Sequence, residues 1–364
     1  MKQTILAINP GSTSTKIALF EGSELKYEKS LSHSSEDLAK FETISSQFEF
    51  RKNTIKENLL ENGIELCDID IVIGRGGLTY PIESGTYEVN DAMKRDLHNP
   101  PLGQHACNLG GLIADDLARE IRESSGKVVG AYIADPVVVD EMQDVARVSG
   151  HPKFKRISIF HALNQKAIAR LYAKDMGVNY EDINVIVAHL GGGVSVGAHR
   201  RGRVVDVNNA LDGDGPMSPE RSGTIPSGQL MRMCFSGEYT KEEVSKMIKG
   251  AGGFVAHVGT NDARRVRAAR DSGDTHAELI LDAFTYQVSK AIGEMAVVLK
   301  GEVDAILITG GIAHGECTVE QITSQVSWIA PVKVYAGEDE MGALAQNALG
   351  VLTGEIEPRV YLGV

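Results

Sequence analysis

The sequence predicts an α/β fold in two domains, and three observations support this prediction. The chain has 364 residues, which is more than twice the roughly 150 residues of a typical domain. Short apolar, β-prone runs alternate with segments of helical periodicity. Four of these runs end in turns of small residues, an arrangement typical of the edge of an α/β sheet where ligands bind. With 42% hydrophobic residues, the chain can form cores of ordinary size.

Four strand-like runs carry the expected turns. In chain order they are residues 5–8 before Asn9-Pro10-Gly11-Ser12, residues 69–73 before Gly74-Arg75-Gly76-Gly77, residues 185–187 before His189-Leu190-Gly191-Gly192-Gly193, and residues 305–308 before Thr309-Gly310-Gly311. Two of them resemble each other, because residues 5–8 and 185–188 are each followed by a glycine-containing turn and a second β-prone run. Both units read as hairpins about half a chain apart, which indicates an internal duplication. Coincidence between two hairpins is the alternative.

Helical periodicity is clear in residues 279–299 and is also present in 162–176 and 340–352. Residues 206–228, in contrast, are rich in Gly, Pro, Asp and Ser, and a loop of this length in a compact protein is usually functional. The segment Gly150-His151-Pro152 favours a domain boundary.

Charge and cysteine content exclude several functions. The 49 acidic and 37 basic residues give a net charge of −12, which disfavours binding to nucleic acid or an anionic membrane surface. Cys67, Cys107, Cys234 and Cys317 form no C-x-x-C pair, so we expect buried free thiols rather than metal clusters or redox pairs. No apolar run approaches the roughly 20 residues that cross a bilayer, and the apolar segment near the N-terminus is too short for a signal peptide. These features predict a soluble, cytoplasmic protein.

Three glycine-rich turns indicate nucleotide binding. The turn of Asn9, Ser12, Ser14 and Lys16 combines backbone N–H groups, hydroxyls and a cation, which suit a phosphate, although a plain tight turn explains it equally well. It is not a G-x-x-x-x-G-K-[ST] loop. Together with 191–193 and 310–311, it makes a nucleotide the better prediction.

Four other residues stand out by position. Arg75 ends a strand among glycines and Arg221 lies in the long loop, and arginine suits bidentate binding of carboxylate or phosphate. His161 opens a helix, and Asp135 follows a strand, where a carboxylate can hold Mg²⁺. The alternatives are solvated arginines, a structural histidine and a helix-capping aspartate.

Taken together, these motifs resemble those of the acetate and butyrate kinase family, in the same order from Asn9 to Glu340. They are N-x-G-S-x-S-x-K, R-G-G, F-H, H-L-G-G-G, E-R-S-G and T-G-G-I. Residues 190–197 and 205–215 resemble the butyrate kinase branch most closely. The resemblance implies two domains of duplicated actin-like, ribonuclease H-like topology with a cleft that closes on ATP. Residues 1–150 plus 343–364 would form the first domain, with a returning C-terminal helix, and residues 151–342 the second, nucleotide-binding domain.

The resemblance also implies roles for matching residues. The catalytic residues would be Arg75, Asp135, His161, Arg221 and Glu340. The residues that bind the acid would be Arg75, Gly76, Gly77, Leu97, His98, Phe160 and Arg221. The residues that bind ATP or ADP would be Asn9, Ser12, Ser14, Lys16, His189, Gly191, Gly192, Gly193, Asp262, Ala263, Arg264, Gly310, Gly311 and Ile312. Mg²⁺ would be held by Asn9, Asp135 and Glu340. Acetate kinases carry asparagine where this chain has Gly192, so a backbone contact must replace a side-chain contact there.

The implied reaction is reversible phosphoryl transfer from ATP to butyrate, giving butyryl phosphate and ADP. A carboxylate is ionised at pH 7, so the reaction needs positioning and charge neutralisation rather than a base. Gly76 and Gly77 would enlarge the acid pocket relative to acetate kinases, unless they serve a backbone bend with positive φ. Isobutyrate, propionate and acetate are alternative substrates, and an actin-like ATPase switch or a sugar kinase with Asp135 as base are alternative functions. We also expect a homo-oligomer, a dimer or larger.

Overall fold

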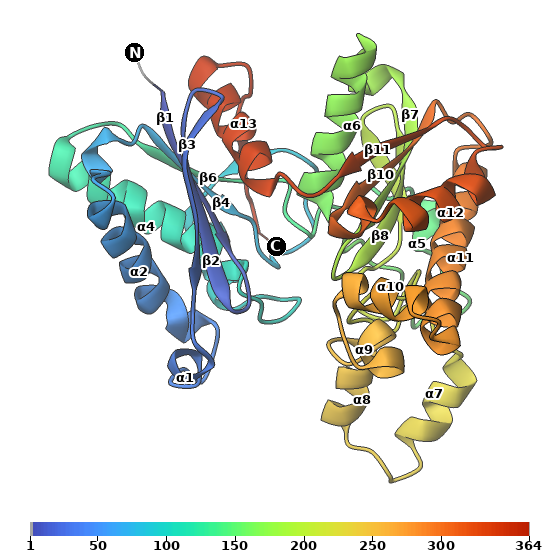
Figure 1. The fold of residues 1–364 in the computed structure, drawn as a ribbon. Helices are drawn as coiled ribbons and strands as arrows, with labels where there is room; N and C mark the ends of the chain where they lie inside the picture. The colour runs from blue at the N-terminus through green and yellow to red at the C-terminus, as the bar shows by residue number, and fades with distance from the viewer. Residues whose placement is uncertain (1–2, 364) are drawn as a thin grey trace. The chain divides into compact units, whose positions relative to one another are not determined.

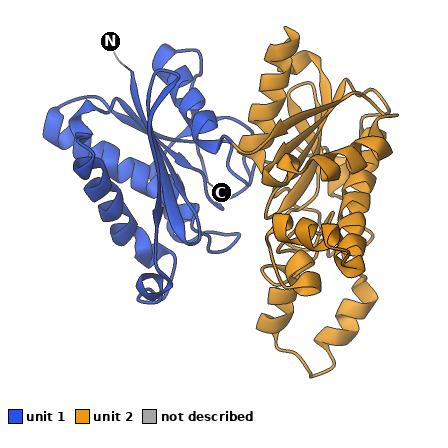
Figure 2. Ribbon diagram, viewed as in Figure 1, with its two compact units in different colours: residues 1–139, 339–364 blue, residues 140–338 orange. Residues whose placement is uncertain are grey.

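The computed structural model describes residues 3–363, which form two compact units (Figure 2). Unit 1 consists of residues 1–139 and 339–364, and unit 2 of residues 140–338. Met1, Lys2 and Val364, which the expected first domain includes, lie outside the described residues. Each unit has one main β-sheet with helices on both faces, which confirms the predicted α/β class.

Unit 1 is built on a sheet whose order, in the part of the chain described, is β12-β5-β6-β4-β1-β2-β3. Its strands are β1 (Thr4–Pro10), β2 (Ser14–Glu21), β3 (Glu24–Ser32), β4 (Ile71–Arg75), β5 (Thr86–Glu88), β6 (Gly130–Ala134) and β12 (Arg359–Val360). Strands β1, β4 and β6 are parallel, so their carboxyl ends lie at one edge of the sheet. The residues that end or follow these strands are therefore neighbours.

Helices cover both faces of the unit 1 sheet. They are α1 (Ser35–Leu38), α2 (Phe48–Glu61), α3 (Asp91–His98), α4 (Asn108–Ser125) and α13 (Glu340–Thr353). Both α4 and α13 contact β1, β4 and β6, and Figure 1 shows them on opposite faces. At Gly74, an added Cβ would overlap the Gly110 carbonyl of α4, so these glycines permit close packing of helix and strand.

Unit 2 contains a sheet of order β11-β10-β7-β8-β9. Its strands are β7 (Asn184–Leu190), β8 (Val194–Arg200), β9 (Arg203–Val207), β10 (Ala305–Gly310) and β11 (Val332–Ala336). Its helices are α5 (Asp144–Arg147), α6 (Ala162–Met176), α7 (Ser227–Cys234), α8 (Lys241–Ile248), α9 (Gly253–Val258), α10 (Ala263–Asp271), α11 (Thr275–Val298) and α12 (Glu316–Val326).

The two faces of this sheet pack against different helices. On β7, Val185 and Val187 share a buried cluster with residues of α6, whereas Ile186 and Ala188 share another with residues of α11. Because successive side chains of a strand point to opposite faces, the continuous apolar run of β7 satisfies both clusters.

The two sheets repeat one topology. In unit 1, β1 pairs with β2 antiparallel and with β4 parallel, and in unit 2, β7 pairs with β8 antiparallel and with β10 parallel. The hairpins whose sequences resemble each other thus occupy equivalent places. This confirms the predicted duplication.

The units divide at different residues from the expected boundaries. The sequence suggested boundaries at 150/151 and 342/343, and the compact units divide at 139/140 and 338/339. Residues 140–150 belong to unit 2 because Glu141 forms a buried ion pair with Lys166 of α6, at 2.6 Å, and Gln143 N–H donates to the Val205 carbonyl. Gly150-His151-Pro152 marks a local turn, whereas hydrogen-bond partners decide which unit a segment joins.

The expected helix and loop are present, whereas three of the four cysteines are exposed instead of buried. Helix 162–176 is confirmed as α6, and the region between β9 and α7 is the predicted loop. The expectation of buried thiols is wrong for Cys67, Cys234 and Cys317, which are exposed, whereas Cys107 is buried and burial raises its pKa to about 11. None of the helices described is both long and apolar enough to span a membrane.

Candidate functional site

The carboxyl edge of the unit 1 sheet gathers predicted site residues from three strands. Asn9 lies at the end of β1, Arg75 is the last residue of β4, and Asp135 follows β6. Because β4 pairs with both β1 and β6 in parallel register, the three positions are adjacent across the edge. The sequence separation between them gave no sign of this proximity.

Glu340 joins this edge from the start of α13. Its Oε1 lies 2.9 Å and its Oε2 3.0 Å from Arg75 Nη1, and the Asn9 amide donates to Oε2 at 2.5 Å. The side chains of Arg75 and Glu340 are 22% and 13% exposed. A guanidinium presents five N–H donors in a fixed fork, which suits arginine to bind carboxylates.

Asp135 is held in a constrained conformation. It is buried, its φ is 38°, and its Oδ1 accepts hydrogen bonds from Ser84 Oγ at 2.6 Å and from the Gly85 N–H at 2.9 Å. A positive φ is costly for a residue other than glycine and is found preferentially at functional sites. Both groups donate to the same carboxylate oxygen and so fix the orientation of the side chain.

The first glycine-containing turn is organised by Arg51, which no sequence motif had singled out. Arg51 of α2 is fully buried and donates to the carbonyl oxygens of Gly11, Ser12 and Ser14 at 2.8, 3.1 and 2.9 Å. Burial lowers its pKa to about 10. Since carbonyl oxygens repel anions, drawing them toward Arg51 suits a phosphate-binding turn. Lys16, however, pairs with Glu28 of β3 at 3.0 Å.

The residues of unit 1 that are expected to bind the acid differ in burial. Leu97 has no exposed surface and lies in the apolar core, and His98 is exposed at the end of α3. An added Cβ would lie 2.5 Å from Pro136 Cβ at Gly76 and 2.6 Å from Asn108 Cα at Gly77. The suggestion of a positive-φ bend is wrong, because neither glycine has a positive φ. Both glycines are thus closely packed, and their contribution to the acid pocket stays a prediction.

In unit 2, the turn 191–193 joins β7 to β8. Gly191 N–H donates to the Gly193 carbonyl at 3.0 Å, and Ser218 Oγ of the long loop donates to the Gly192 carbonyl at 2.8 Å. An added Cβ at Gly193 would overlap the guanidinium of Arg221, which donates to the Ala210 carbonyl at 2.5 Å. Burial lowers the pKa of Arg221. The predicted loop thus brings Arg221 to the predicted turn.

Two of the predicted histidines stack beside this turn. The rings of His161 and His189 are parallel to within 13°, with centroids 3.8 Å apart. His161 Nδ1 lies 2.8 Å from Ser195 Oγ of β8. His189 is buried, with Nδ1 2.7 Å from Asn164 Oδ1 and Nε2 3.2 Å from a Glu338 oxygen. Phe160, next to His161, is buried and only 2% exposed.

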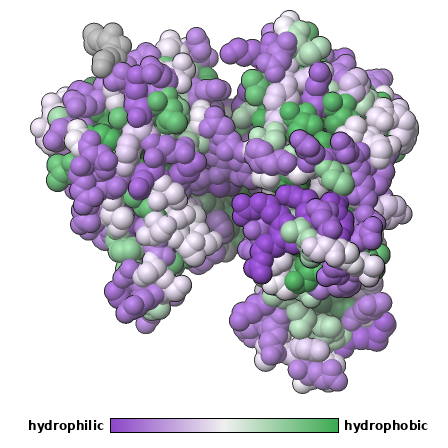
Figure 3. All heavy atoms as spheres, in the orientation of Figure 1, coloured by the Kyte–Doolittle hydropathy of each residue, from purple (hydrophilic) through white to green (hydrophobic). Residues whose placement is uncertain are grey.

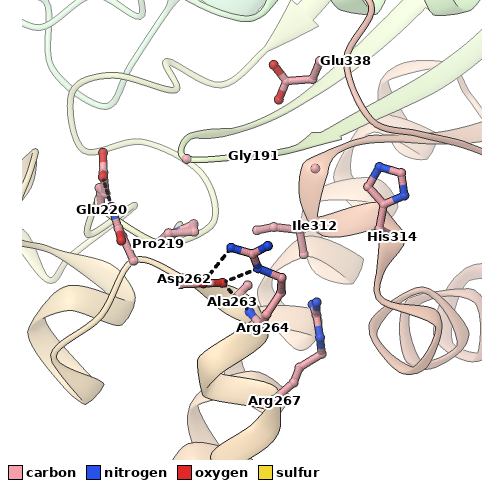
Figure 4. A pocket seen from close by; sticks show the side chains of 13 residues that line it. Gly191, Pro219, Glu220, Asp262, Ala263, Arg264, Arg267, Ile312, His314 and Glu338 are labelled. Carbon is pink, nitrogen blue, oxygen red and sulfur yellow. Dashed lines mark hydrogen bonds and ion pairs between the residues drawn. The ribbon is translucent and has the colours of Figure 1, made fainter. Parts of the chain in front are cut away.

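A cavity of about 730 Å³ in unit 2 is lined by three of the predicted nucleotide motifs (Figure 4). Its volume is within the range of small-molecule sites. The lining residues are Gly191, Gly192, Pro219, Glu220, Asn261, Asp262, Ala263, Arg264, Arg267, Gly311, Ile312, His314 and Glu338. Gly310 has a φ of 92° and approaches the Leu190 carbonyl closely, so a side chain is excluded there.

Arginines of α10 border this cavity. Arg264 donates to both carboxylate oxygens of Asp262 at 2.9 Å, and this contact lowers the Asp262 pKa to about 2. Figure 4 shows Arg264 and Arg267 extending from α10 toward the segment of Ile312 and His314. Arg267 Nη1 is buried without a hydrogen-bond partner. With Arg265 and Arg270, these residues give α10 the strongly hydrophilic surface seen in Figure 3, in a chain that is acidic overall.

Sequence reasoning missed Arg267, His314 and Glu338 of this cavity, along with Ser195 and Ser218. Arg267 lies one helical turn beyond the predicted Arg264, and that spacing was a usable signal once α10 was recognised. Glu338 and Ser195 carried no local signal, because their neighbours come from distant segments.

Comparisons with known proteins agree with these arrangements. Residues 154–334 match the acetokinase family model. The chain is 54% identical to butyrate kinase 2 of Clostridium acetobutylicum over 361 residues, covering 99% of this chain and 100% of that protein. It is 52% identical, with the same coverage, to a probable butyrate kinase of Clostridium botulinum. An acetate kinase structure from Porphyromonas gingivalis has a TM-score of 0.76 at 19% identity, covering 96% of this chain and all of that one, which establishes the fold.

The two repeated sheets are therefore those of the actin-like fold. The similarity to the butyrate kinases extends over almost the entire chain rather than over one motif. This protein belongs to the acetate and butyrate kinase family.

Proposed function

We propose that this chain is a butyrate kinase, which transfers the γ-phosphoryl group of ATP to the carboxylate of butyrate and releases butyryl phosphate and ADP. A carboxylate oxygen forms a bond to the γ-phosphorus while the bond from that phosphorus to the β,γ-bridging oxygen breaks, and the electron pair stays on ADP. The observation that carries the proposal is the unit 2 cavity, which is lined by residues of three segments predicted to bind nucleotide, 191–192, 262–264 and 311–312. The 52–54% identity to butyrate kinases supports the choice of acid.

The nucleotide would lie in this cavity. The base and ribose would contact Asp262, Ala263, Arg264 and Ile312, and the phosphates would approach the backbone at 191–193 and 310–311. Glycine at these turns leaves the backbone accessible, and Gly192 has no heavy atom within 4 Å of an added Cβ. An unhindered backbone there replaces the asparagine contact of acetate kinases.

Charge neutralisation is the main task of the remaining groups, since two anions must meet. In unit 1, Arg75 would bind the acid while Glu340 and Asn9 fix its guanidinium. In unit 2, Arg221 and His161 would contact the transferring phosphoryl group. No side chain is needed as a general base, and the Asp135 side chain is held in place by two donors on Oδ1.

The donor set fits a nucleotide-bound Mg²⁺ rather than a resident metal. Within residues 3–363, no three His, Cys, Asp or Glu side chains cluster as a metal site. Mg²⁺ commonly takes one or two carboxylates together with substrate phosphates. We propose that Asp135 and Glu340 bind this Mg²⁺, directly or through water, and that Asn9 Oδ1 is a further oxygen ligand. When bound, Mg²⁺ offsets the negative charge of the phosphates.

Trapping with hydroxylamine tests the proposal, because an acyl phosphate gives a hydroxamate and a sugar phosphate does not. We expect ATP- and butyrate-dependent hydroxamate, with smaller kcat/KM for acetate. ADP release without hydroxamate would overturn the proposal in favour of an ATPase or sugar kinase. A panel with isobutyrate and propionate identifies the preferred acid. A cytoplasmic location and a homo-oligomer stay predictions, which fractionation and light scattering can check.

A further inference from the structure

Behind His161 lies a continuous row of buried polar side chains for which the proposed chemistry gives no role. His161 Nδ1 is 2.8 Å from Ser195 Oγ, which is 2.8 Å from Gln165 Nε2. Gln165 Oε1 is 2.9 Å from His199 Nε2, and His199 Nδ1 is 2.7 Å from the Tyr180 hydroxyl. Ser195, Gln165 and His199 have no exposed surface, and Tyr180 is 5% exposed. Such a buried row needs each group to have a matching partner.

The orientation of Gln165 is fixed by a backbone group. Its amide faces the Ser195 carbonyl oxygen at 3.1 Å as well as Ser195 Oγ. A carbonyl oxygen only accepts hydrogen bonds, so the Gln165 atom that faces it is the NH₂ group. Gln165 Oε1 consequently points at His199. At Gly197, an added Cβ would lie 2.5 Å from this oxygen, so the strand leaves space for the amide.

His199 is neutral and carries its proton on Nε2. Its Nε2 faces the Gln165 oxygen, an acceptor, and therefore donates. Burial, with the charges of Lys166 and Arg170, holds the His199 pKa well below its ordinary value of 6.5. Nδ1 then accepts from the Tyr180 hydroxyl. Both ring nitrogens of His199 therefore have hydrogen-bond partners, and the ring holds the Gln165 amide in this orientation.

The orientation of Gln165 determines which hydrogen bond the Ser195 hydroxyl makes to His161. Its Oγ accepts a hydrogen bond from Gln165 Nε2, and the His161 backbone N–H approaches it at 3.5 Å. With donors on these two sides, the serine hydrogen is directed at its remaining neighbour, His161 Nδ1, at 2.8 Å. A histidine whose Nδ1 accepts a hydrogen bond carries its proton on Nε2.

We propose that Ser195, oriented by Gln165 and His199, is a positioning residue that keeps the proton of His161 on Nε2, so that His161 meets the transferring phosphoryl group as a neutral hydrogen-bond donor. Phosphoryl oxygens accept hydrogen bonds, and the opposite tautomer would present a lone pair to an anion. The role toward phosphoryl rests on the proposed function, whereas the tautomer itself does not.

Nuclear magnetic resonance of the ¹⁵N-histidine-labelled full chain, without substrate, tests the tautomer directly. The His161 signals are assigned by their loss in His161→Gln. We expect a protonated-type Nε2 and an unprotonated-type Nδ1, and a mixture of tautomers in Ser195→Ala. A proton on Nδ1 in the wild-type protein would overturn the inference, as would a Ser195→Ala spectrum with an unchanged Nε2–H tautomer.

Kinetics test whether Ser195 acts through His161. Removing the partner that orients a metal-bound histidine typically lowers activity about 10- to 100-fold, and we expect a fall of similar size in kcat for Ser195→Ala with nearly unchanged KM values. Ser289→Ala is the matched control, because Ser289 is also buried in unit 2 and its Oγ has no hydrogen-bond partner. We expect it to retain wild-type kcat.

A double-mutant cycle separates positioning from mere structure. If Ser195 acts through His161, Ser195→Ala costs nothing further in the His161→Gln background, whereas multiplying losses contradict the inference. If Ser195→Ala fails to fold, the wild-type spectrum still decides the tautomer and Gln165→Met replaces it in the cycle. Absence of hydroxamate from the wild-type enzyme would refute the proposed function alone, and an active enzyme with Nδ1–H would refute the inference alone.

Discussion

Arg75 and Arg221 are each fixed by the backbone or side chains of their own unit. Glu340 and Asn9 hold Arg75, and the Ala210 carbonyl and the Gly193 turn hold Arg221. Replacing either with Ala leaves an anion without its counter-charge, so we expect kcat/KM for hydroxamate formation to fall about 100-fold or more. Exposed Arg232 of α7 supplies the control, Arg232→Ala. Near wild-type rates in both site variants would refute their assignment.

Arg267 places a buried, unpartnered Nη1 beside the unit 2 cavity. An unsatisfied donor is costly in the free protein, which makes a bound nucleotide its natural partner. A hydrogen bond from a charged group contributes about 1.5–3 kcal/mol, so we expect the KM for ATP to rise about tenfold or more in Arg267→Ala, with unchanged KM for butyrate.

The neighbouring Arg265→Ala is the matched control, because Arg265 lies on the same helix and is exposed. Urea unfolding should show Arg267→Ala to be no less stable than the wild type, since the variant removes an unpaired buried group. An unchanged KM for ATP would exclude Arg267 from the nucleotide site.

Substitution of Gly77 distinguishes two roles for this glycine, which are close packing against α4 and enlargement of the acid pocket. An added Cβ would lie 2.6 Å from Asn108 Cα and 2.8 Å from Leu97 Cδ2. We therefore expect Gly77→Ala to lower the free energy of unfolding by about 1–3 kcal/mol, as overpacking does, and to reduce activity with acetate and butyrate alike.

Gly293→Ala is the control for this change. Gly293 lies within α11 and nothing lies within 4 Å of an added Cβ, so the substitution should raise stability by about 0.5–1 kcal/mol. If Gly77→Ala instead favoured acetate over butyrate with little loss of stability, the pocket interpretation would be correct after all.

At the scale of elements, the β1–β2 turn depends on α2 and on the segment after β3. Arg51 donates to Thr15 Oγ1 at 3.1 Å, and His33 Nε2 lies 2.8 Å from the same oxygen. Burial first, and then the charge of Arg51, lower the His33 pKa to about 4, while Asp37 opposes this shift. The turn is thus built on a histidine that must stay neutral.

This arrangement predicts a pH dependence of stability. The His33 pKa lies near 4 in the folded chain against an ordinary value of 6.5, so the unfolded chain binds the proton first as pH falls. The contribution of neutral His33 is fully present above pH 6.5 and is lost as pH falls toward 4. We expect Tm to drop over this interval and to drop less in His33→Gln. Exposed His151→Gln is the control, and equal slopes in all three proteins would contradict the prediction.

At the scale of the whole molecule, Arg75, which is proposed to bind the acid, lies in unit 1, and the nucleotide cavity lies in unit 2. The chain crosses between the units at 139/140 and 338/339. Three consecutive residues carry the second crossing, with Glu338 bonded to His189 in unit 2 and Glu340 bonded to Arg75 in unit 1. These two contacts thus flank the second crossing on either side of Asp339.

Phosphoryl transfer requires the acid-binding and the nucleotide-binding groups to reach the same pair of substrates. We therefore expect the two units to close on the substrates when these bind. Small-angle scattering should show a smaller radius of gyration with butyrate and a nonhydrolysable ATP analogue than with either absent. Butyrate alone is the control. An unchanged radius at saturation would exclude closure.

The sequence by itself determined the α/β class, the repeated hairpins, the family and the turns that bring glycine to strand ends, because each depends on residues close together in the chain. Helix 162–176 and the turn 191–193 are read directly from local patterns. The tertiary structure decided which distant residues share a site. Glu340 meets Arg75 across 265 positions, Arg51 holds a turn near residue 12, and Ser195 faces His161 only because β8 passes the start of α6. It also showed that Gly77 is small because α4 approaches it closely, since the contacts that fill space and satisfy buried hydrogen bonds are made between segments whose separation along the chain carries no pattern.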